Sequence, residues 1–541
     1  MVFDSLSPLQ KLRKAYCPPI PAILEDLRVL SFSKEVIAPS QRDVTELKSL
    51  FPNTLGQPFV RGSKGEARTT KALKVGAVFS GGQAAGGHTV LAGLFDALKA
   101  LHPRSRLFGF LGGPSGIIDS SYREISLEML ADYRNQGGFD LIGSGRTKIE
   151  TAHQLRAALA CVDNLELSGL VIIGGDDSNT NAAVLAEYFL EMGSKTKVVG
   201  VPKTIDGDLR NEWVPISFGF DTACKVYSEL IGNIARDVIS AKKYTHFIKL
   251  MGRSASHVAL ECALSTHPNI ALIGEEVAFH KRKLSEITSE LCDVICKRAE
   301  QGKNYGVILV PEGLIEFIPE VGALIKELNA LFGSSVVKDV REICSALSAT
   351  SKQCFDSLPE AIQKQLLFDR DPHGNVQVSL IETERLLIET VGKELEERKK
   401  QGRFKGKFSG QHHFFGYEGR AAFPSNFDCN YCYSLGQVAA LLLDEGLTGY
   451  MSAVYNLHRP VKEWQIAGLP LTMLLNLEVR QGKPKPVIQK ALVDLNGAAF
   501  KRFARERDGW ALGDFYRFQG PIQFFGDPSV TESLPHILEV S

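Results

Sequence analysis

The sequence predicts an α/β protein in which largely parallel sheets are covered by helices. From Lys74 onward, short apolar runs alternate with amphipathic helical patterns, as in repeated βα units. The runs are almost uniformly apolar, which is typical of parallel strands buried on both faces. Most of them stop at glycine or a charged residue, so the functional groups are expected at the carboxyl edges of the sheets.

Seven strands and one early helix follow from this pattern. The expected strands are residues 75–79, 107–111, 170–173, 198–201, 247–250, 270–273 and 307–310. Residues 88–101 place Val90, Leu94 and Leu98 on one helical face, and Pro103 ends that helix. Residues 1–70 are expected to form an N-terminal extension packed on the main body. Residues 315–407 change to a mostly helical pattern, which predicts an insertion.

The composition excludes several classes of partner. A chain of 541 residues predicts two domains with additional segments. Its 62 Lys and Arg residues balance 62 Asp and Glu residues, so no overall field attracts nucleic acid or an acidic membrane. No apolar leader and no eighteen-residue apolar run occur, which predicts a cytoplasmic protein without membrane contact.

The ten cysteines are scattered and are expected to be reduced, buried thiols. Cys429 and Cys432 have CxxC spacing, and Cys292 and Cys296 are one helical turn apart. Neither pair has the flanking Cys or His residues that a structural zinc site requires.

A glycine-rich segment at residues 81–88 lies between the first strand and the first helix. Small residues at such a turn let backbone N–H groups surround an anion with a helix dipole behind them, which favours phosphate. The alternative is a tight turn without a ligand. The segment matches neither the P-loop nor the dinucleotide-binding fingerprint.

Two acidic turns follow neighbouring strands. Asp176 and Asp177 come after Gly174 and Gly175, where a carboxylate can hold Mg²⁺ that bridges phosphate oxygens. The alternative for one of the pair is a helix N-cap.

The second turn contains Lys203, Asp206 and Asp208. In an extended chain the two aspartates would share one face, with Ile205 on the other. A carboxylate there can accept a proton from a sugar hydroxyl while the lysine neutralises phosphoryl charge. The alternative is a polar turn, but the two acidic turns together indicate a phosphotransferase.

Three further charged residues are candidates: Arg253 follows Leu250-Met251-Gly252, Arg420 follows Tyr417-Glu418-Gly419, and Glu312 follows an apolar run. Arg253 and Arg420 are candidate phosphate ligands, because a guanidinium group presents a planar pair of donors to phosphate oxygens. Glu312 is a candidate acceptor for sugar hydroxyls, and the alternative is an ion pair with an arginine.

Taken in order, these segments resemble the phosphofructokinase family, and within it the long pyrophosphate-dependent phosphotransferases of bacteria and plants. The resemblance runs from about Lys74 to Arg420 and beyond. It implies two Rossmann-like three-layer α/β domains with parallel-rich sheets and an active site in the cleft between them. It also implies Mg²⁺-dependent, reversible phosphoryl transfer from pyrophosphate to the 1-hydroxyl of fructose 6-phosphate, giving fructose 1,6-bisphosphate and phosphate.

The resemblance assigns roles residue by residue. Asp176 matches the Mg²⁺ ligand, and Asp206 matches the base that deprotonates the fructose 1-hydroxyl. The expected catalytic set is Asp206, Lys203, Asp177 and Arg253. Substrate contacts are expected from Gly81, Gly82, Thr204, Ile205, Asp206, Asp208, Met251, Gly252, Arg253, Glu312, Tyr417, Glu418, Gly419 and Arg420. Lys243 and Tyr244 fall where the family reaches into a neighbouring subunit's site, which implies an oligomer, with a homodimer expected.

The implied domains are residues 71–225 for pyrophosphate and magnesium, joined by part of the C-terminal region, and residues 226–314 for the sugar phosphate. Residues 408–541 complete the sugar-phosphate site and the C-terminal region.

Two positions bear on the phosphoryl donor. ATP-using relatives generally have glycine at the positions of Asp177 and Lys203. Like unit charges about 4 Å apart at an effective dielectric of 20 repel by about 4 kcal/mol, so Asp177 disfavours an ATP α-phosphate. The alternatives are an ATP-dependent 6-phosphofructokinase and a non-catalytic regulatory subunit. A non-catalytic subunit is expected to lack Asp176, Asp206 or Arg253. All three residues are present in this sequence.

Overall fold

The computed structural model describes residues 6–36, 44–67, 69–333, 343, 345–370, 375–480, 483–521 and 523–538. The chain divides into two compact units. Unit 1 comprises Met1–Ala223, Glu418–Ala491 and Gln523–Leu534, and unit 2 comprises Cys224–Tyr417, Leu492–Ile522 and Pro535–Ser541. Parts of the predicted extension and insertion, at 1–5, 37–43, 68, 334–342, 344 and 371–374, lie outside the described residues.

Unit 1 is built on one large sheet with the order β1-β2-β14-β13-β7-β6-β3-β4-β5, and β8 pairs with β7. The central strands β13, β7, β6, β3 and β4 are mutually parallel. Its strands are β1 (Leu30–Glu35), β2 (Phe59–Lys64), β3 (Lys74–Ser80), β4 (Arg106–Phe110), β5 (Tyr122–Glu124), β6 (Gly169–Gly174), β7 (Lys197–Thr204), β8 (Phe218–Gly219), β13 (Tyr450–Tyr455) and β14 (Gln465–Pro470). A separate hairpin pairs β15 (Leu475–Arg480) with β16 (Lys483–Ile488).

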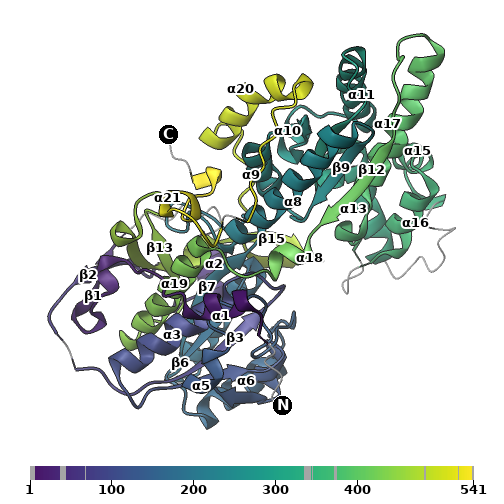
Figure 1. Cartoon of the computed structure of the whole chain (residues 1–541). Helices are drawn as coiled ribbons and strands as arrows, with labels where there is room; N and C mark the ends of the chain where they lie inside the picture. Colours follow the sequence, from purple (N-terminus) through teal and green to yellow (C-terminus); the bar gives the residue numbers. More distant parts are fainter. Residues whose placement is uncertain are drawn as a thin grey trace, which may run out of the picture. The chain divides into compact units, whose positions relative to one another are not determined.

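Two helices of unit 1, α3 (Gly87–Leu101) and α19 (Asn426–Asp444), lie side by side (Figure 1). Their backbones approach closely at two glycines. A Cβ on Gly93 would lie 2.1 Å from the Tyr433 carbonyl oxygen, and one on Gly436 would lie 2.2 Å from the Val90 carbonyl oxygen. Elsewhere in the unit, α7 (Asp176–Glu191) packs on β6 and β7, and α6 (Ala152–Asn164) contacts α7.

Unit 2 contains an all-parallel sheet with the order β10-β11-β9-β12. The strands are β9 (Thr245–Leu250), β10 (Ile270–Ala271), β11 (Gly306–Pro311) and β12 (Gly410–Phe415). The helices include α8 (Phe220–Ala241, which begins in unit 1), α9 (His257–Thr266), α10 (Gly274–Phe279), α11 (Leu284–Glu300), α13 (Pro319–Gly333), α15 (Ala349–Ser357), α16 (Glu360–Phe368), α17 (Thr383–Lys400) and α20 (Ala498–Leu512). Leucines and isoleucines of α11, α13 and α17 share one core with β11.

The α/β class and the parallel sheets predicted from the sequence are confirmed. One expected strand is shorter than predicted: β10 ends at Ala271, because Ile273 is already the N-cap of α10. The antiparallel strands at both edges of the large sheet were not predicted. Strands β1 and β2 come from the N-terminal segment, which therefore extends the sheet as well as packing on it.

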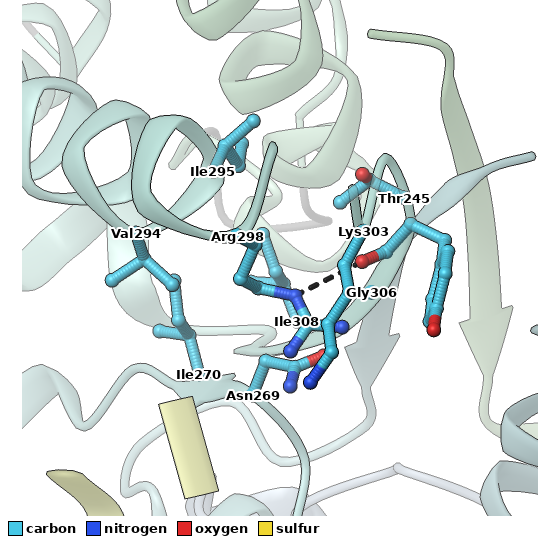
Figure 2. Close-up of a pocket in the computed structure, with 10 residues that line it drawn as sticks. Thr245, Asn269, Ile270, Val294, Ile295, Arg298, Lys303, Gly306 and Ile308 are labelled. Carbon is cyan, nitrogen blue, oxygen red and sulfur yellow. Dashed lines mark hydrogen bonds between the residues drawn. The ribbon is translucent and has the colours of Figure 1, made fainter. Parts of the chain in front are cut away.

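A polar junction around Arg298 and Asn269 fixes the C-terminal segment of unit 2, and Figure 2 shows these two residues among those that line the small cavity beside it. The Arg298 guanidinium donates to the carbonyl oxygen of Tyr305 and to the carboxylate of Asp514, while the Asn269 amide donates to the Gly513 carbonyl oxygen. The cavity beside these residues measures about 10 Å³, which is no more than a single water needs. This junction is therefore structural.

The strand register places the ends of several strands at the same level. In unit 1, Ser80 of β3 pairs with Gly174 of β6, and Gly174 pairs with Pro202 of β7. In unit 2, Leu250 of β9 pairs with both Pro311 of β11 and Phe415 of β12. Within each unit, the residues that follow these strands are consequently neighbours, and the two groups include most of the predicted site residues.

Candidate active site

The glycine-rich loop of unit 1 begins at Gly81, whose φ of +89° favours glycine. Its N–H donates to the Gly145 carbonyl oxygen at 2.8 Å, which ties the loop to residues 143–148. Basic side chains surround the loop: a Cβ on Gly82 would lie 3.5 Å from Arg146 and 3.7 Å from Arg420. Cationic side chains therefore gather around the loop, an arrangement suited to an anion.

The helix that follows this loop begins in a closely packed environment. Helix α3 begins at Gly87, and its first turn is buried. A Cβ on Gly86 would lie 2.4 Å from Cys432 Sγ, and one on Gly87 would lie 2.2 Å from the Phe139 ring. Packed side chains thus leave no room for a Cβ at this helix end, which accounts for the two glycines.

The first acidic turn opens helix α7. Gly175 is the N-cap, so Asp176 and Asp177 are its first two helical residues and the N-cap alternative is wrong. Carboxylates in a first helical turn are stabilised by the helix dipole. Asp177 is exposed, and its Oδ1 accepts a hydrogen bond from Lys148 Nζ at 2.9 Å.

Lys203 belongs to β7 and is 5 % exposed. Its Nζ donates to the Gly82 carbonyl oxygen at 2.6 Å. Burial lowers the pKa of Lys203 to about 8, and the negative charges of Asp206 and Asp176 offset part of that effect. These interactions place the acid turns of β6 and β7 in one electrostatic cluster.

The second acidic turn is bent, which corrects the extended conformation expected from the sequence. Strand β7 ends at Thr204, and Gly207 has a φ of +74°. The Asp206 N–H donates to Thr204 Oγ1 at 3.1 Å, and Ile205 is buried. Ile205 is thus almost completely removed from solvent, whereas Asp206 is partly exposed.

Asp208 lies close to the same cluster but is almost completely buried. Burial and the nearby charge of Asp206 raise the pKa of Asp208 to about 7, while Lys490 opposes the rise. Lys490 Nζ lies 3.8 Å from Asp176 Oδ2 and 3.9 Å from Asp208 Oδ2. The two acidic turns predicted from the sequence thus meet around one ammonium group.

Sequence reasoning missed three cationic residues of this cluster: Arg146, Lys148 and Lys490. The first two belong to the segment Gly-Ser-Gly-Arg-Thr-Lys at residues 143–148, whose small residues and paired cations were a usable signal. Lys490 follows a hairpin about 280 residues after Asp208, and no local pattern marks it.

In unit 2, the turn after β9 is held by the turn after β11. Gly252 has a φ of +143°, and its N–H donates to Glu312 Oε2 at 2.8 Å. The Met251 N–H donates to the Phe415 carbonyl oxygen at 2.9 Å. Glu312 is 1 % exposed, whereas Arg253 is exposed, so Glu312 supports a loop that presents the Arg253 side chain to solvent.

The segment 417–420 forms the short helix α18 (Tyr417–Arg420). The Tyr417 side chain is 63 % exposed, Glu418 is exposed and Gly419 is buried. Arg420 belongs to unit 1 and lies beside the Gly82 loop.

Lys243 and Tyr244 lie far from the other predicted residues of unit 2. They precede β9, whereas Met251 follows its last residue. Six residues of strand at about 3.3 Å each separate the two ends by about 20 Å. Both side chains are exposed at that opposite edge.

The described cysteines are mostly buried, and Cys432 packs against Gly86 of the glycine-rich segment. In the described part of the chain the nine cysteines are free thiols, and no three His, Cys, Asp or Glu side chains form a group suited to a metal. Burial raises the pKa of the Cys429 thiol to about 12, which makes it a poor nucleophile.

The chain belongs to the phosphofructokinase family, whose model matches residues 74–443.

Curated relatives match over nearly the whole chain. A pyrophosphate--fructose 6-phosphate 1-phosphotransferase of Treponema pallidum is 53 % identical, covering 98 % of this chain and 96 % of its own. Subunit beta 1 of the enzyme of the same name from Arabidopsis thaliana is 56 % identical, covering 91 % and 87 %. Subunit alpha from Solanum tuberosum is 44 % identical, covering 96 % and 87 %.

Among solved structures, the pyrophosphate-dependent phosphofructokinase from Nitrosospira multiformis is similar in fold, with a TM-score of 0.55 and 16 % identity, covering 86 % of this chain and 95 % of its own.

Within the described residues, no helix has the length and apolar character needed to cross a membrane.

Proposed function

We propose that this chain is an enzyme that transfers a phosphoryl group reversibly between pyrophosphate and the 1-hydroxyl of fructose 6-phosphate, giving fructose 1,6-bisphosphate and phosphate. One observation carries the proposal: the buried Lys203 joins the glycine loop to the acidic turns that contain Asp176 and Asp206. A compact anion with several charges suits this arrangement. The names of the close relatives support the same substrates.

In the proposed reaction, Asp206 is the general base. Its carboxylate accepts the proton of the sugar hydroxyl as that oxygen attacks phosphorus, and the bond to the leaving phosphate breaks. Lys203 and Arg146 stabilise the negative charge on the phosphoryl oxygens. Positioned base catalysis of this kind typically contributes a factor of about 10²–10⁴ in rate.

The donor set fits a magnesium ion. Asp176 supplies a partly exposed carboxylate oxygen beside the glycine loop, and Mg²⁺ prefers one or two such oxygens with the remaining positions taken by substrate and water. A group of three protein ligands is therefore not required. When bound, Mg²⁺ supplies charge stabilisation at the phosphate oxygens.

Asp177 and Lys203 favour pyrophosphate over ATP. The Asp177 carboxylate repels an additional phosphate group, and Lys203 compensates the dense charge of a short diphosphate. The ion pair between Asp177 and Lys148 offsets part of the repulsion, so the 4 kcal/mol estimated above is an upper limit. The space that the Asp177 side chain fills then accounts for a larger share of the preference for pyrophosphate over ATP.

Residues of unit 2 and helix α18 bind the sugar phosphate in this proposal. Arg253 and Arg420 are the phosphate ligands, assisted by Met251, Gly252 and the exposed Tyr417 and Glu418. Glu312 acts first by holding the Gly252 backbone. Contact of the sugar with Glu312 itself is proposed from the family resemblance.

The protein is proposed to work as a cytoplasmic homodimer. Lys243 and Tyr244 lie at the amino end of β9, about 20 Å from Met251 at the other end. A role for both ends in catalysis therefore calls for a second subunit. Relatives named as alpha and beta subunits make a hetero-oligomer the competing arrangement.

The decisive experiment is a coupled assay of the purified protein with fructose 6-phosphate and Mg²⁺, with pyrophosphate or ATP as donor. Turnover with pyrophosphate, and at least a hundredfold lower kcat/KM with ATP, is expected. Preference for ATP would establish the ATP-dependent alternative. Inactivity with both donors would favour a non-catalytic subunit.

A further inference from the structure

Lys490 reaches the acid cluster from a segment that is fixed on both sides. It follows β16, whose last residue, Ile488, donates its N–H to Thr180 Oγ1 of α7 at 3.2 Å. The N–H of Ala491 donates to the Asp208 carbonyl oxygen at 2.7 Å. The Lys490 backbone is thereby held between the two acidic turns.

The Lys490 ammonium group is placed symmetrically with respect to two carboxylates. It lies 3.8 Å from Asp176 Oδ2 and 3.9 Å from Asp208 Oδ2, both within ion-pair range and longer than a hydrogen bond. The Asp208 side chain is 6 % exposed and that of Lys490 is 36 % exposed. A cation thus interacts with a nearly buried carboxylate and with the proposed metal ligand at once.

Lys203 has a different position in the cluster. Its Nζ donates to the Gly82 carbonyl oxygen, which directs it to the glycine loop. Two lysines from separate elements therefore differ in their contacts: Lys203 is hydrogen-bonded to the loop and interacts with Asp206 and Asp176, whereas Lys490 lies between Asp176 and Asp208.

We propose that Lys490 is the resident counter-cation of the Asp176–Asp208 pair and competes with a divalent cation for these carboxylates. The inference rests on the proposed function only in taking Asp176 as the metal ligand. It implies that a free divalent cation binds weakly, and that the cation enters together with the diphosphate, whose charge the cluster of lysines and arginines attracts.

The test is a titration of the intact protein with Mn²⁺, without phosphate or sugar. Electron paramagnetic resonance measures the binding. Lys490→Met is expected to bind Mn²⁺ about tenfold more tightly than wild type, and Lys490→Arg is expected to match wild type. Lys485→Met is the matched control, because Lys485 lies on the same hairpin and pairs with Glu150 outside the acid cluster. Metal-free methylenediphosphonate is expected to bind Lys490→Met several-fold more weakly.

Equal or weaker Mn²⁺ binding by Lys490→Met, including no detectable binding, would overturn the proposal. Damage to the fold would weaken binding, which is opposite in sign to the expected result, and circular dichroism of each variant checks this. The titration needs no turnover. Failure of the wild type to use pyrophosphate would therefore count against the proposed function and leave the Mn²⁺ result intact.

Discussion

The Lys203 ammonium group donates a 2.6 Å hydrogen bond to the carbonyl oxygen of Gly82. This bond joins the end of β7 to the loop after β3, across the intervening strand β6. Burial lowers the pKa of Lys203 to about 8, so its charge depends on the neighbouring carboxylates Asp206 and Asp176. The glycine-rich loop, the two acidic turns and Lys203 are consequently coupled to one another.

Replacing the proposed base separates catalysis from binding. Asp206→Ser is expected to lower kcat by about 10²–10⁴-fold while leaving the dissociation constant for fructose 6-phosphate within about threefold, because a base acts mainly in the transition state. Turnover by coupled assay and binding by calorimetry measure the two effects. Asp356→Ser, on an exposed face of α15, is the control. A near wild-type rate would remove Asp206 from the mechanism.

The donor preference is expected to depend on two side chains. Asp177→Gly, alone or with Lys203→Gly, is expected to reduce kcat/KM for pyrophosphate and to admit measurable turnover with ATP. Lys148→Met, which removes the partner of Asp177, is expected to leave ATP excluded because the aspartate and its charge remain. Steady-state kinetics with each donor provide the comparison. An unchanged ratio of the two donors in Asp177→Gly would contradict the assignment.

Glu312 is expected to act through the loop that it supports. Glu312→Ala removes the acceptor for the Gly252 N–H, and losing a hydrogen bond to a charged group costs about 1.5–3 kcal/mol. KM for fructose 6-phosphate should therefore rise roughly ten- to a hundredfold. Glu312→Gln keeps one oxygen acceptor and should be milder, and Glu300→Ala on the exposed end of α11 is the control. Equal KM in Glu312→Ala and wild type would show that this bond does not organise the loop.

Asp428 introduces a pH dependence into the stability of unit 1. Burial and the nearby Asp221 raise the pKa of Asp428 to about 7, although Thr222 and Gly219 donate hydrogen bonds to it. The folded state keeps a proton that the unfolded chain loses near pH 4. The contribution of this proton to the free energy of unfolding is complete below pH 4. It declines as pH rises to about 7, by at most about 1.4 kcal/mol per pH unit.

Urea unfolding at several pH values between 4 and 8 measures this dependence. Asp428→Asn is expected to be less stable overall, because one amide oxygen replaces two acceptors. It should also show a shallower decline of stability with pH than wild type. Parallel pH profiles for the two proteins would show that Asp428 does not titrate in this range.

The contact between α3 and α19 is expected to tolerate no added methyl group. Gly93→Ala places a Cβ about 2.1 Å from the Tyr433 carbonyl oxygen, so it should lower the melting temperature by several degrees despite the better helix propensity of alanine. Gly392→Ala in α17 is the matched control, because its Cβ would lie 3.8 Å from Phe408. That change should raise stability by up to about 1 kcal/mol. Scanning calorimetry distinguishes the two; equal effects would rule out the close contact.

The sequence predicted seven parallel strands because they are short, apolar and followed by glycine or charge, but it missed β13, a buried strand parallel to β7. Strands such as β12, with the exposed residues Gln411 and His412, do not show this pattern. The antiparallel pairing of β14 with β2 joins segments about 400 residues apart, and no local periodicity specifies such a pairing.

The same distinction holds for the site. Asp176 and Lys203 were predictable because they lie at or directly after strand ends, where register brings them together. The bend at Gly207 and the covered start of α3 depend on contacts with other elements. Lys490 reaches Asp176 only through the tertiary fold, so its role could not be inferred from neighbouring residues.

The matched strand ends in the two sheets also bear on how such a protein changes over evolutionary time. Apolar pairs within β3, β6 and β7 set the level at which each strand stops, whereas Asp177 lies outside those pairs. A substitution at that position leaves the hydrophobic scaffold untouched. If Asp177 selects the phosphate compound, as proposed, that preference can drift by single amino-acid replacements in a lineage whose architecture stays constant.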